Sequence, residues 1–345
     1  MGGKQMLVEQ VTTVAGDPSP PAGWAERHAI AALVLRRGAI GVLTLFVVSV
    51  LIFVATEVLP GNAAYAVLGH TATPARIKAI EDQLHLNRSI PYQYWSWISG
   101  VLSGHPGRSF ADGQGVWSLV APRLVNSAVL VVLAGVIGTV LGVVLGAVAA
   151  LRKDSWFDHL SSVVALAVTS LPEFVVAIAL IILFSTVVLH LLPAVSLIPP
   201  GTYSWSRPEL LVLPTATLVL VIVPYILRMM RAAMVEALES DYVEMARLEG
   251  LRPWRVTFVH ALPNAIAPTV QVIGLNFLYL AGGIVIVEDV FNYPGIGQGL
   301  VNAVNDRDIP TIQLIVVILA AFYVFVNIAS DVVALLASPR RRLGR

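Results

Sequence analysis

The chain has 345 residues, of which 57% are hydrophobic and only 12% are charged, and its mean hydropathy is +0.80. A soluble domain carries about 25% charged residues, so this composition excludes an ordinary water-soluble globular protein. The net charge of +1 gives no indication of nucleic-acid binding, and the lack of cysteine excludes disulfides, thiolate chemistry and iron–sulfur clusters. Composition therefore indicates an integral membrane protein.

The first segment, residues 1–38, is predicted to be a cytoplasmic tail. Met1–Gly23 contains three prolines and is expected to be disordered. Trp24–Arg37 fits either an amphipathic helix on the membrane surface or an extended connection to the first span. The apolar run that follows is not expected to be a cleavable signal peptide, because almost forty residues precede it and no small-residue cleavage site follows.

Six apolar stretches are long enough to cross a membrane. A hydrocarbon core of about 30 Å requires about 20 mostly apolar residues in a helix, since an open structure of any other kind leaves backbone groups unpaired in lipid. The third stretch is long enough to tilt, to bend at Pro172 or to emerge from the bilayer. The predicted spans are Ala39–Leu59, Asn126–Leu151, His159–His190, Leu210–Arg231, Ile266–Val287 and Thr311–Leu336.

The distribution of lysine and arginine predicts the orientation of these spans. If the N-terminus is cytoplasmic, the cytoplasmic segments hold 15 of these residues and the opposite segments hold 7. Cytoplasmic loops carry the excess of positive charge in membrane proteins. We therefore expect a multi-pass protein of the bacterial cytoplasmic (inner) membrane with both termini in the cytoplasm.

The regions between the spans differ in character. After the first span, taken as 39–60, the loop 61–125 is polar and aromatic, which predicts an extracytoplasmic cap. The remainder, 126–337, is predicted to be the transmembrane core, followed by a cytoplasmic tail, 338–345. Within the core, the cytoplasmic segment 232–264 has apolar residues at helical spacing, namely Met234, Leu238, Tyr242 and Met245. A helical segment of this length is a candidate docking element.

This cytoplasmic segment contains the most informative motif of the chain, DYVEMARLEGLRPWRVTFVHALPNAIAP (Asp241–Pro268). It resembles the signature of the inner-membrane permeases of ABC importers, which is Glu-Ala-Ala, three residues, Gly, nine residues, an apolar residue, one more, then Leu-Pro. Met245 and His260 depart from that signature in a way typical of its peptide-permease branch. The matching residues, with Asp241 at the start, are Glu244, Ala246, Gly250, Leu262 and Pro263.

Gly250 explains the physical sense of the motif. A glycine adopts a left-handed backbone conformation without steric cost and ends one helix, so that a second, short helix starts at an angle. The resemblance implies that this helix–turn–helix docks in a cleft of the ATPase subunit and transmits its closure. The alternative is an ordinary polar loop with a helix-capping glycine.

Other stretches are similar to the dipeptide, oligopeptide and nickel branch of these permeases, from about Val34 to Arg342. They include EVLPGNAA after the first span and Leu84–Phe110 in the long loop. EDVFNYPGIGQGL after the fifth span is similar to the family's Glu-x-x-Phe-x-x-Pro-Gly-x-Gly, and NIASDVVALLASPRRR lies near the end. These stretches supply gating or structural candidates: Glu288, Pro294, Gly295, Gly297 and Asp331.

Ionisable residues inside a membrane are costly and are candidates for function. Glu173 lies roughly 21 Å into the third span by helical rise. Pro172 beside it bends the helix. Either Glu173 faces the translocation pathway and attracts a substrate amino group or a cation, or it is protonated or hydrogen-bonded between helices. For Asp331, in the sixth span, a structural hydrogen bond is the favoured interpretation.

The resemblance implies an all-α fold of six transmembrane helices in the type I ABC importer arrangement, and a transport subunit rather than an enzyme. It implies two ATPase subunits, which hold ATP and Mg²⁺, a second homologous permease, and an extracytoplasmic substrate-binding protein. None of the chain's three lysines lies in a phosphate-binding loop, so it is not the ATPase, and we expect no cofactor. The histidines do not cluster, so no metal site is predicted.

Peptides are the favoured substrate, in a binding-protein-dependent system embedded in lipid. A nickel, metal-chelate or glutathione permease is the alternative within the same family. A proton-driven secondary transporter using Glu173, and a membrane-anchored interaction protein, are the alternatives from other classes. The docking motif, Glu244–Pro263, argues against the secondary transporter, and six spans with a gating-style loop argue against the interaction protein.

Overall fold

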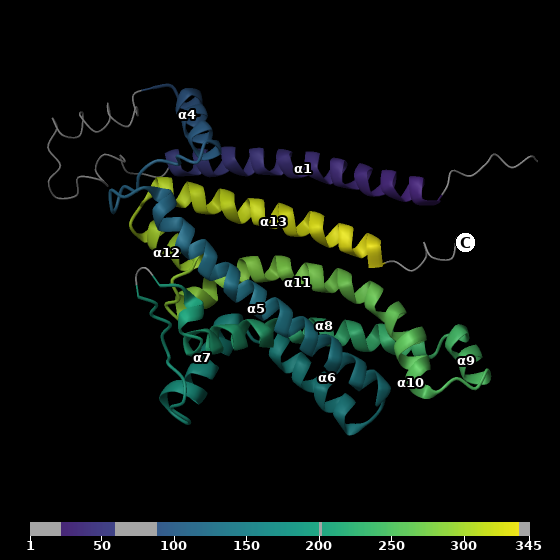
Figure 1. Ribbon diagram of the computed structural model, residues 1–345. Helices are drawn as coiled ribbons and strands as arrows, with labels where there is room; N and C mark the ends of the chain where they lie inside the picture. The colour runs from purple at the N-terminus through teal and green to yellow at the C-terminus, as the bar shows by residue number, and fades with distance from the viewer. Residues whose placement is uncertain (1–21, 59–87, 200–201, 338–345) are drawn as a thin grey trace, which may run out of the picture.

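The computed structural model describes residues 22–58, 88–199 and 202–337, and its regular elements are helices (Figure 1). The predicted all-α class is confirmed. The α-helices are α1 (Ala22–Val58), α4 (Ile90–Leu102), α5 (Val116–Leu151), α6 (Trp156–Thr169), α7 (Glu173–Ile181), α8 (Glu209–Leu238), α9 (Asp241–Leu248), α10 (Pro253–Arg255), α11 (Leu262–Val290), α12 (Ile296–Asn305) and α13 (Ile309–Ala337). Two π-helical turns, Ile182–Thr186 and Val256–Ala261, and a 3₁₀ turn, Ser204–Ser206, complete the set over these residues.

Within the described residues, five helices are long and apolar enough to cross a membrane, and the bent pair α6–α7 makes a sixth if it is one span. The predicted count of six spans therefore depends on that pair. The two helices meet at an angle of 106°. The third predicted span, His159–His190, is therefore wrong as a single helix, and of the outcomes foreseen for it the bend at Pro172 is the one found.

Proline chemistry explains the bend. Pro172 is the N-cap of α7 and has an extended backbone (ψ 148°), while Ser170 ends α6. A proline has no N–H to donate and disfavours the helical conformation in the residue before it. The helix also ends at Thr186, before the predicted His190, which has a positive φ of 50°.

Several helices extend beyond the predicted spans. Helix α1 runs without a break from Ala22, so Trp24–Arg37 is neither a separate surface helix nor an extended connection. Helix α5 begins at Val116, ten residues before the predicted Asn126, because polar residues of its first turns bind other protein groups there instead of water. Of the predicted cap at 61–125, residues 61–87 lie outside the described part.

The predicted docking segment 232–264 is not one helix. Helix α8 continues to Leu238, well beyond the predicted end at Arg231, and α9 starts separately at Asp241. The second helix after Gly250 is also not short, because α10 and the π-helical turn lead directly into α11. A candidate span consequently extends over Pro253–Val290.

Helix α8 is the centre of the bundle. Its most apolar stretch is 72% buried, whereas the corresponding stretches of the other single-helix candidate spans are 17–33% buried. Helix α5 packs closely on it through glycines at every fourth position. A methyl group at Gly138 would lie 2.4 Å from Ile222, and one at Gly146 would lie 2.5 Å from the Leu227 carbonyl oxygen. Small residues at this spacing allow membrane helices to approach each other closely.

Ion pairs fasten the outer layers of the bundle. Asp158 of α6 accepts a bidentate interaction from Arg231 of α8. Helix α1 lies along α13 (Figure 1), and Arg37 Nε lies 2.7 Å from Asp331 Oδ2 between them. Asp331 thus makes an ion pair, while its Oδ2 has no hydrogen-bond partner among the described residues, so the hydrogen bond favoured from the sequence stays a prediction.

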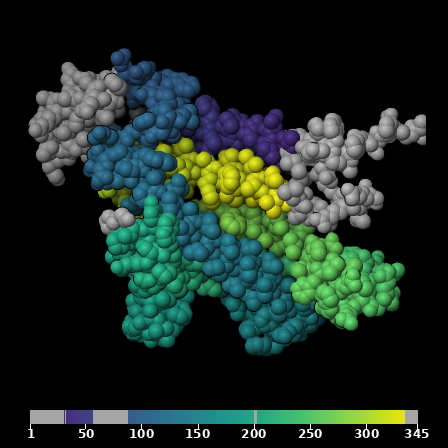
Figure 2. Space-filling model, in the orientation of Figure 1, coloured from purple at the N-terminus to yellow at the C-terminus, as the bar shows by residue number. Residues whose placement is uncertain are grey.

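The bundle has two different ends (Figure 1). Helices α9 and α10 lie at one of them, called here the α9 end, and α4 and α12 lie at the other, called the α12 end. Figure 2 shows the α9–α10 segment projecting at one end of the molecule, and a hollow between the chain regions of α6 and α7. The 106° bend between these two helices creates that hollow.

Candidate functional site: two helix ends and one polar face

Helix α9 ends in a Schellman motif at Gly250. The Leu251 N–H donates to the Ala246 carbonyl over 3.3 Å, and the Gly250 N–H donates to the Arg247 carbonyl over 3.0 Å. Gly250 has φ +78°, the left-handed conformation predicted for it. A glycine adopts this conformation without a steric penalty, and the next helix then leaves in a new direction.

One side of α9 is fixed to the bundle. Val243 and Ala246 are buried in an apolar cluster with Met234 of α8 and with Val256 and Ala261 of the π-helical turn. This cluster explains why an eight-residue helix with little stability of its own holds a defined position. Among the motif residues, Ala246 belongs to this buried side, and Leu262 packs against the same cluster.

The other side of α9 is exposed and is not purely polar. Met245 is 59% exposed, Leu248 is 76% exposed and Trp254 of α10 is 58% exposed. Asp241 and Glu244 are also exposed, as are Gly250 and Pro263. Apolar side chains rimmed by charged ones are typical of a surface that binds another protein.

The α12 end is organised around Glu288, which is fully buried. Glu288 Oε2 accepts hydrogen bonds from the N–H groups of Gly297 (2.7 Å) and Gln298 (3.3 Å) at the start of α12. Ser127 of α5 donates its hydroxyl to Glu288 Oε1 and accepts the N–H of Ile296 over 2.7 Å. A carboxylate of α11 and a hydroxyl of α5 therefore cap the first turn of α12, whose positive helix-dipole end favours a negative group.

The glycines of this motif provide space for the carboxylate. A methyl group at Gly295 would lie 2.0 Å from Glu288 Oε1, and one at Gly297 would lie 2.4 Å from the Val285 Cα atom. Pro294 contributes its carbonyl, which accepts from Asn126 Nδ2 over 3.0 Å. The structure brings together all four motif residues, Glu288, Pro294, Gly295 and Gly297.

Several residues at this end were missed from the sequence. Arg123 donates to Gln298 Oε1 over 3.1 Å, and the Tyr293 hydroxyl donates to the Asn126 carbonyl over 2.8 Å. Burial raises the pKa of Tyr293, so its hydroxyl stays protonated and remains a donor. The available signal was the group of polar residues at the start of an apolar run, namely Arg123 at the end of the predicted loop and Asn126 and Ser127 at the start of the predicted span.

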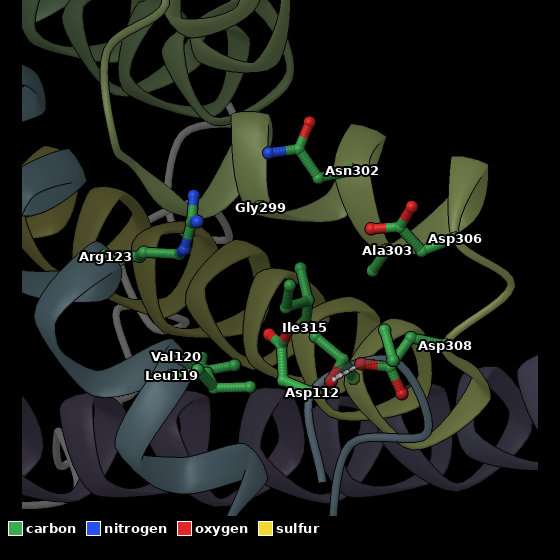
Figure 3. Close-up of a pocket in the computed structure, with 12 residues that line it drawn as sticks. Asp112, Leu119, Val120, Arg123, Gly299, Asn302, Ala303, Asp306, Asp308 and Ile315 are labelled. Carbon is green, nitrogen blue, oxygen red and sulfur yellow. Dashed lines mark hydrogen bonds between the residues drawn. The ribbon is translucent and has the colours of Figure 1, made fainter. Parts of the chain in front are cut away.

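A small cavity of about 60 Å³ lies beside this network, between α5, α12 and α13 (Figure 3). Arg123, Asn302 and three carboxylates line it, and Asp308 among them is already bound to Ser109, Phe110 and Thr311. The volume has room for only a few water molecules. Over the described residues, no group of three or more histidine, aspartate and glutamate side chains is arranged to hold a metal ion. This cavity is therefore not a substrate site.

Glu173 lies on a different part of the molecule, against α11. A methyl group at Gly283 would lie 2.5 Å from Glu173 Oε2, so the bare glycine backbone makes room for the carboxylate. Oε2 is buried and has no hydrogen-bond partner among the described residues, although the carboxylate lies within interacting range of the Tyr279 hydroxyl. An unpaired buried carboxylate oxygen is costly and suggests a ligand site.

The exposed side of α8 and α11 next to Glu173, called here the α8–α11 face, combines polar and apolar groups. Its stripe on α11 runs through Gln271, Leu275, Tyr279 and Gly282. A cavity of about 570 Å³ opens beside it, lined by Tyr225 and Arg228 of α8, Val272 of α11 and Ser162 of α6, among others. Its volume lies in the range of small-molecule sites.

Helix α5 shows what a lipid-facing side looks like in the same protein. Its exposed stripe is entirely apolar at every fourth position: Val132, Val136, Val140 and Val144 are each 52–57% exposed. The α8–α11 face breaks that pattern with glutamine, tyrosine and arginine. Polar side chains within spanning helices face a bundle interior or a water-filled cavity rather than lipid.

These features define a class: a multi-pass membrane transport subunit with one polar face and an exposed, partly apolar helical segment at one end. The chain belongs to the family described as binding-protein-dependent transport system inner membrane component, which matches residues 142–343. The corresponding N-terminal family matches residues 30–131. Membership implies a substrate-binding protein and an ATPase as partners.

Two relatives cover nearly the whole chain. A Sinorhizobium fredii protein named "Probable peptide ABC transporter permease protein y4tP" is 35% identical over 310 residues, 90% of this chain and 98% of its own length. The glutathione transport system permease protein GsiC of Escherichia coli K12 is 34% identical over 299 residues, 87% of this chain and 95% of its own length. The predicted ABC permease class is confirmed.

Proposed function

We propose that this chain is a permease subunit of an ATP-driven importer that carries small peptides across the bacterial cytoplasmic membrane. The α9 segment is the main observation behind this proposal. It is a helix held in place by buried contacts on one side, and its other side, beyond the last turn of α8, exposes apolar side chains. The relatives named as peptide permeases support the substrate class. Glutathione is the second candidate, on the name of the Escherichia coli relative.

In this proposal the α9 end lies in the cytoplasm together with both termini, in agreement with the lysine and arginine distribution. Two ATPase subunits bind ATP and Mg²⁺, and this chain holds no cofactor. Asp241, Glu244 and Gly250 belong to the segment that docks with an ATPase, and a second homologous permease completes the pathway. The α12 end then faces the substrate-binding protein.

Uptake of a labelled peptide into proteoliposomes containing the assembled complex tests this function. We expect uptake to require ATP on the α9 side and the binding protein on the other side, and to continue in the presence of a protonophore. Uptake that stops with the proton gradient while ATP stays high would instead establish a secondary transporter. Competition by glutathione that exceeds competition by tripeptides would favour the second candidate.

A further inference from the structure

Two charged side chains, Glu173 beside the α8–α11 face and Arg228 on it, each have a polar group without a hydrogen-bond partner among the described residues. Glu173 Oε2 is buried without a hydrogen-bond partner among the described residues. Within the same part of the chain, the guanidinium of Arg228 makes no ion pair or hydrogen bond and lines the cavity of about 570 Å³. Arg231, on the next turn of α8, is by contrast bound to Asp158. The two unsatisfied groups have opposite charges.

A pair of tyrosines lies between them. The rings of Tyr225 and Tyr279 have centroids 6.4 Å apart, and both side chains are exposed. Tyr225 precedes Arg228 by three residues on α8, and Tyr279 precedes Gly283, the neighbour of Glu173, by four residues on the antiparallel α11. The backbone levels of Arg228 and of Gly283, against which Glu173 packs, are consequently about 10 Å apart along the bundle at 1.5 Å per helical residue, on opposite sides of the tyrosine pair.

We propose that the α8–α11 face holds a free-ended peptide of two or three residues during passage, with its amino group at Glu173 and its carboxylate at Arg228. An extended chain advances about 3.3–3.6 Å per residue, so two or three residues match the separation of the charges. The tyrosine rings offer hydroxyls and a flat apolar surface to the peptide between its ends. The inference rests on the proposed function and adds a substrate length and a direction.

Uptake of capped peptides by charge-neutralised variants tests the orientation. The complex is reconstituted with Glu173→Gln or Arg228→Gln, and uptake of a free tripeptide is compared with that of its N-acetyl and C-amide forms. We expect Glu173→Gln to lower uptake of the free and amidated peptides about tenfold but that of the acetylated peptide less than about twofold. Arg228→Gln should show the reverse dependence on the two caps.

Matched controls separate this effect from general damage. Glu209→Gln and Arg152→Gln neutralise exposed charges on α8 and after α5 that lie outside this face, and both should leave all three uptake rates unchanged. If Glu173→Gln and Arg228→Gln lower the uptake of all three peptides equally, or of none of them, the inference is overturned while the importer function stays intact. A wild-type complex that takes up no peptide with ATP present would overturn the proposed function first.

A second measurement does not depend on delivery by the binding protein. The chain contains no cysteine, so Leu275→Cys places a single thiol on the face, where Leu275 is 64% exposed. A water-soluble maleimide should label it, whereas Val136→Cys, 56% exposed on α5, should resist labelling in lipid. Free di- and tripeptides should slow labelling of Leu275→Cys several-fold and doubly capped peptides should not. Equal labelling rates with both kinds of peptide would overturn the inference.

Discussion

The α9 end and the α12 end of this bundle contain similar sequence motifs in different structural surroundings. Both contain a glycine-dependent helix terminus, the end of α9 at Gly250 and the start of α12 at Gly295, and an acidic residue of a family motif. At the α12 end, Glu288 and its glycines are buried and the capping groups are bound within the chain. At the α9 end, Glu244 and Gly250 are exposed beside the apolar side chains of Met245 and Leu248. One end is completed by contacts within the chain, and the other leaves apolar side chains exposed.

This difference predicts that substitutions at the two ends affect different properties: the stability of the permease at the α12 end, and association with the proposed ATPase subunits at the α9 end. Changes at the α12 end remove packing and hydrogen bonds that the folded chain already makes, so they should destabilise the permease itself. Changes at the α9 end remove groups that contact little within the chain, so they should leave folding intact and affect association. The following substitutions test this separation, from the largest expected effect to the smallest.

Gly295→Ala should have the largest effect on folding. Its methyl group would lie 2.0 Å from Glu288 Oε1, so the carboxylate must leave the start of α12. We expect a loss of about 3 kcal/mol, from overpacking together with unpaired N–H groups. Thermal unfolding of the purified permease measures it. Gly282→Ala is the matched control, because nothing lies within 4 Å of its added methyl group. Equal midpoints for the two variants would contradict the prediction.

Glu288→Ala should destabilise the permease somewhat less, by about 2–3 kcal/mol, because the N–H groups of Gly297 and Gln298 and the Ser127 hydroxyl lose their partner. Glu288→Gln should recover part of this loss, since an amide oxygen still accepts from Gly297. The neighbouring Asp289 is exposed, and Asp289→Ala should have no effect. Denaturation in mild detergent compares the stabilities of the three variants. A Glu288→Ala permease as stable as the Asp289→Ala permease would refute the capping role of Glu288.

Gly250→Val should strain the Schellman turn by about 1–2 kcal/mol, since a β-branched residue disfavours positive φ. We expect normal membrane insertion but weak co-purification with the ATPase subunits and loss of substrate-stimulated ATP hydrolysis. Glu244→Ala should show a milder defect. Gly113→Val carries similar strain at the α12 end (φ +68°), with no neighbour within 4 Å, and should keep the ATPase bound. Full transport by Gly250→Val would mean that the segment is only a connector.

Leu248→Ser should change the stability of the permease by less than about 0.5 kcal/mol, because the side chain is already 76% exposed. Its expected effect is a several-fold weaker association with the ATPase subunits, measured by titration into proteoliposomes. Leu102→Ser on α4 is the control, with 81% exposure at the opposite end. If both variants bind the ATPase alike, the exposed side of α9 is not the docking surface.

The smallest effect concerns an exposed ion pair. Lys153 donates to Glu239 over 2.5 Å, and this hydrogen bond raises the pKa of Lys153 above its ordinary 10.5. A raised lysine pKa contributes stability that is present below about pH 10.5 and is lost as the pH rises beyond the folded value. Lys153→Met should therefore leave the thermal midpoint almost unchanged between about pH 6 and pH 9. A large drop in the thermal midpoint of Lys153→Met in that pH range would show that the Lys153–Glu239 pair stabilises the permease more than an exposed ion pair does.

The sequence by itself determined the class of the protein and most of its helices. Apolar runs of at least 20 residues have few solutions in lipid, so the spans and their order could be predicted without tertiary contacts. The same holds for Gly250, whose left-handed conformation follows from local backbone sterics and from a motif confined to one segment. Pro172 likewise predicted a bend from its missing N–H alone.

Only the tertiary structure decided which polar residues meet. Ser127 and Glu288 are 161 positions apart, and their contact depends on how α5, α11 and α12 pack, which no local pattern encodes. The start of α5 was misjudged for the same reason, since Arg123 and Asn126 are satisfied by distant protein groups rather than by water. The alignment of Glu173, Tyr279, Tyr225 and Arg228 on one face also requires three helices in register. Hydropathy reports how long a helix remains apolar, but packing sets which side of it faces lipid.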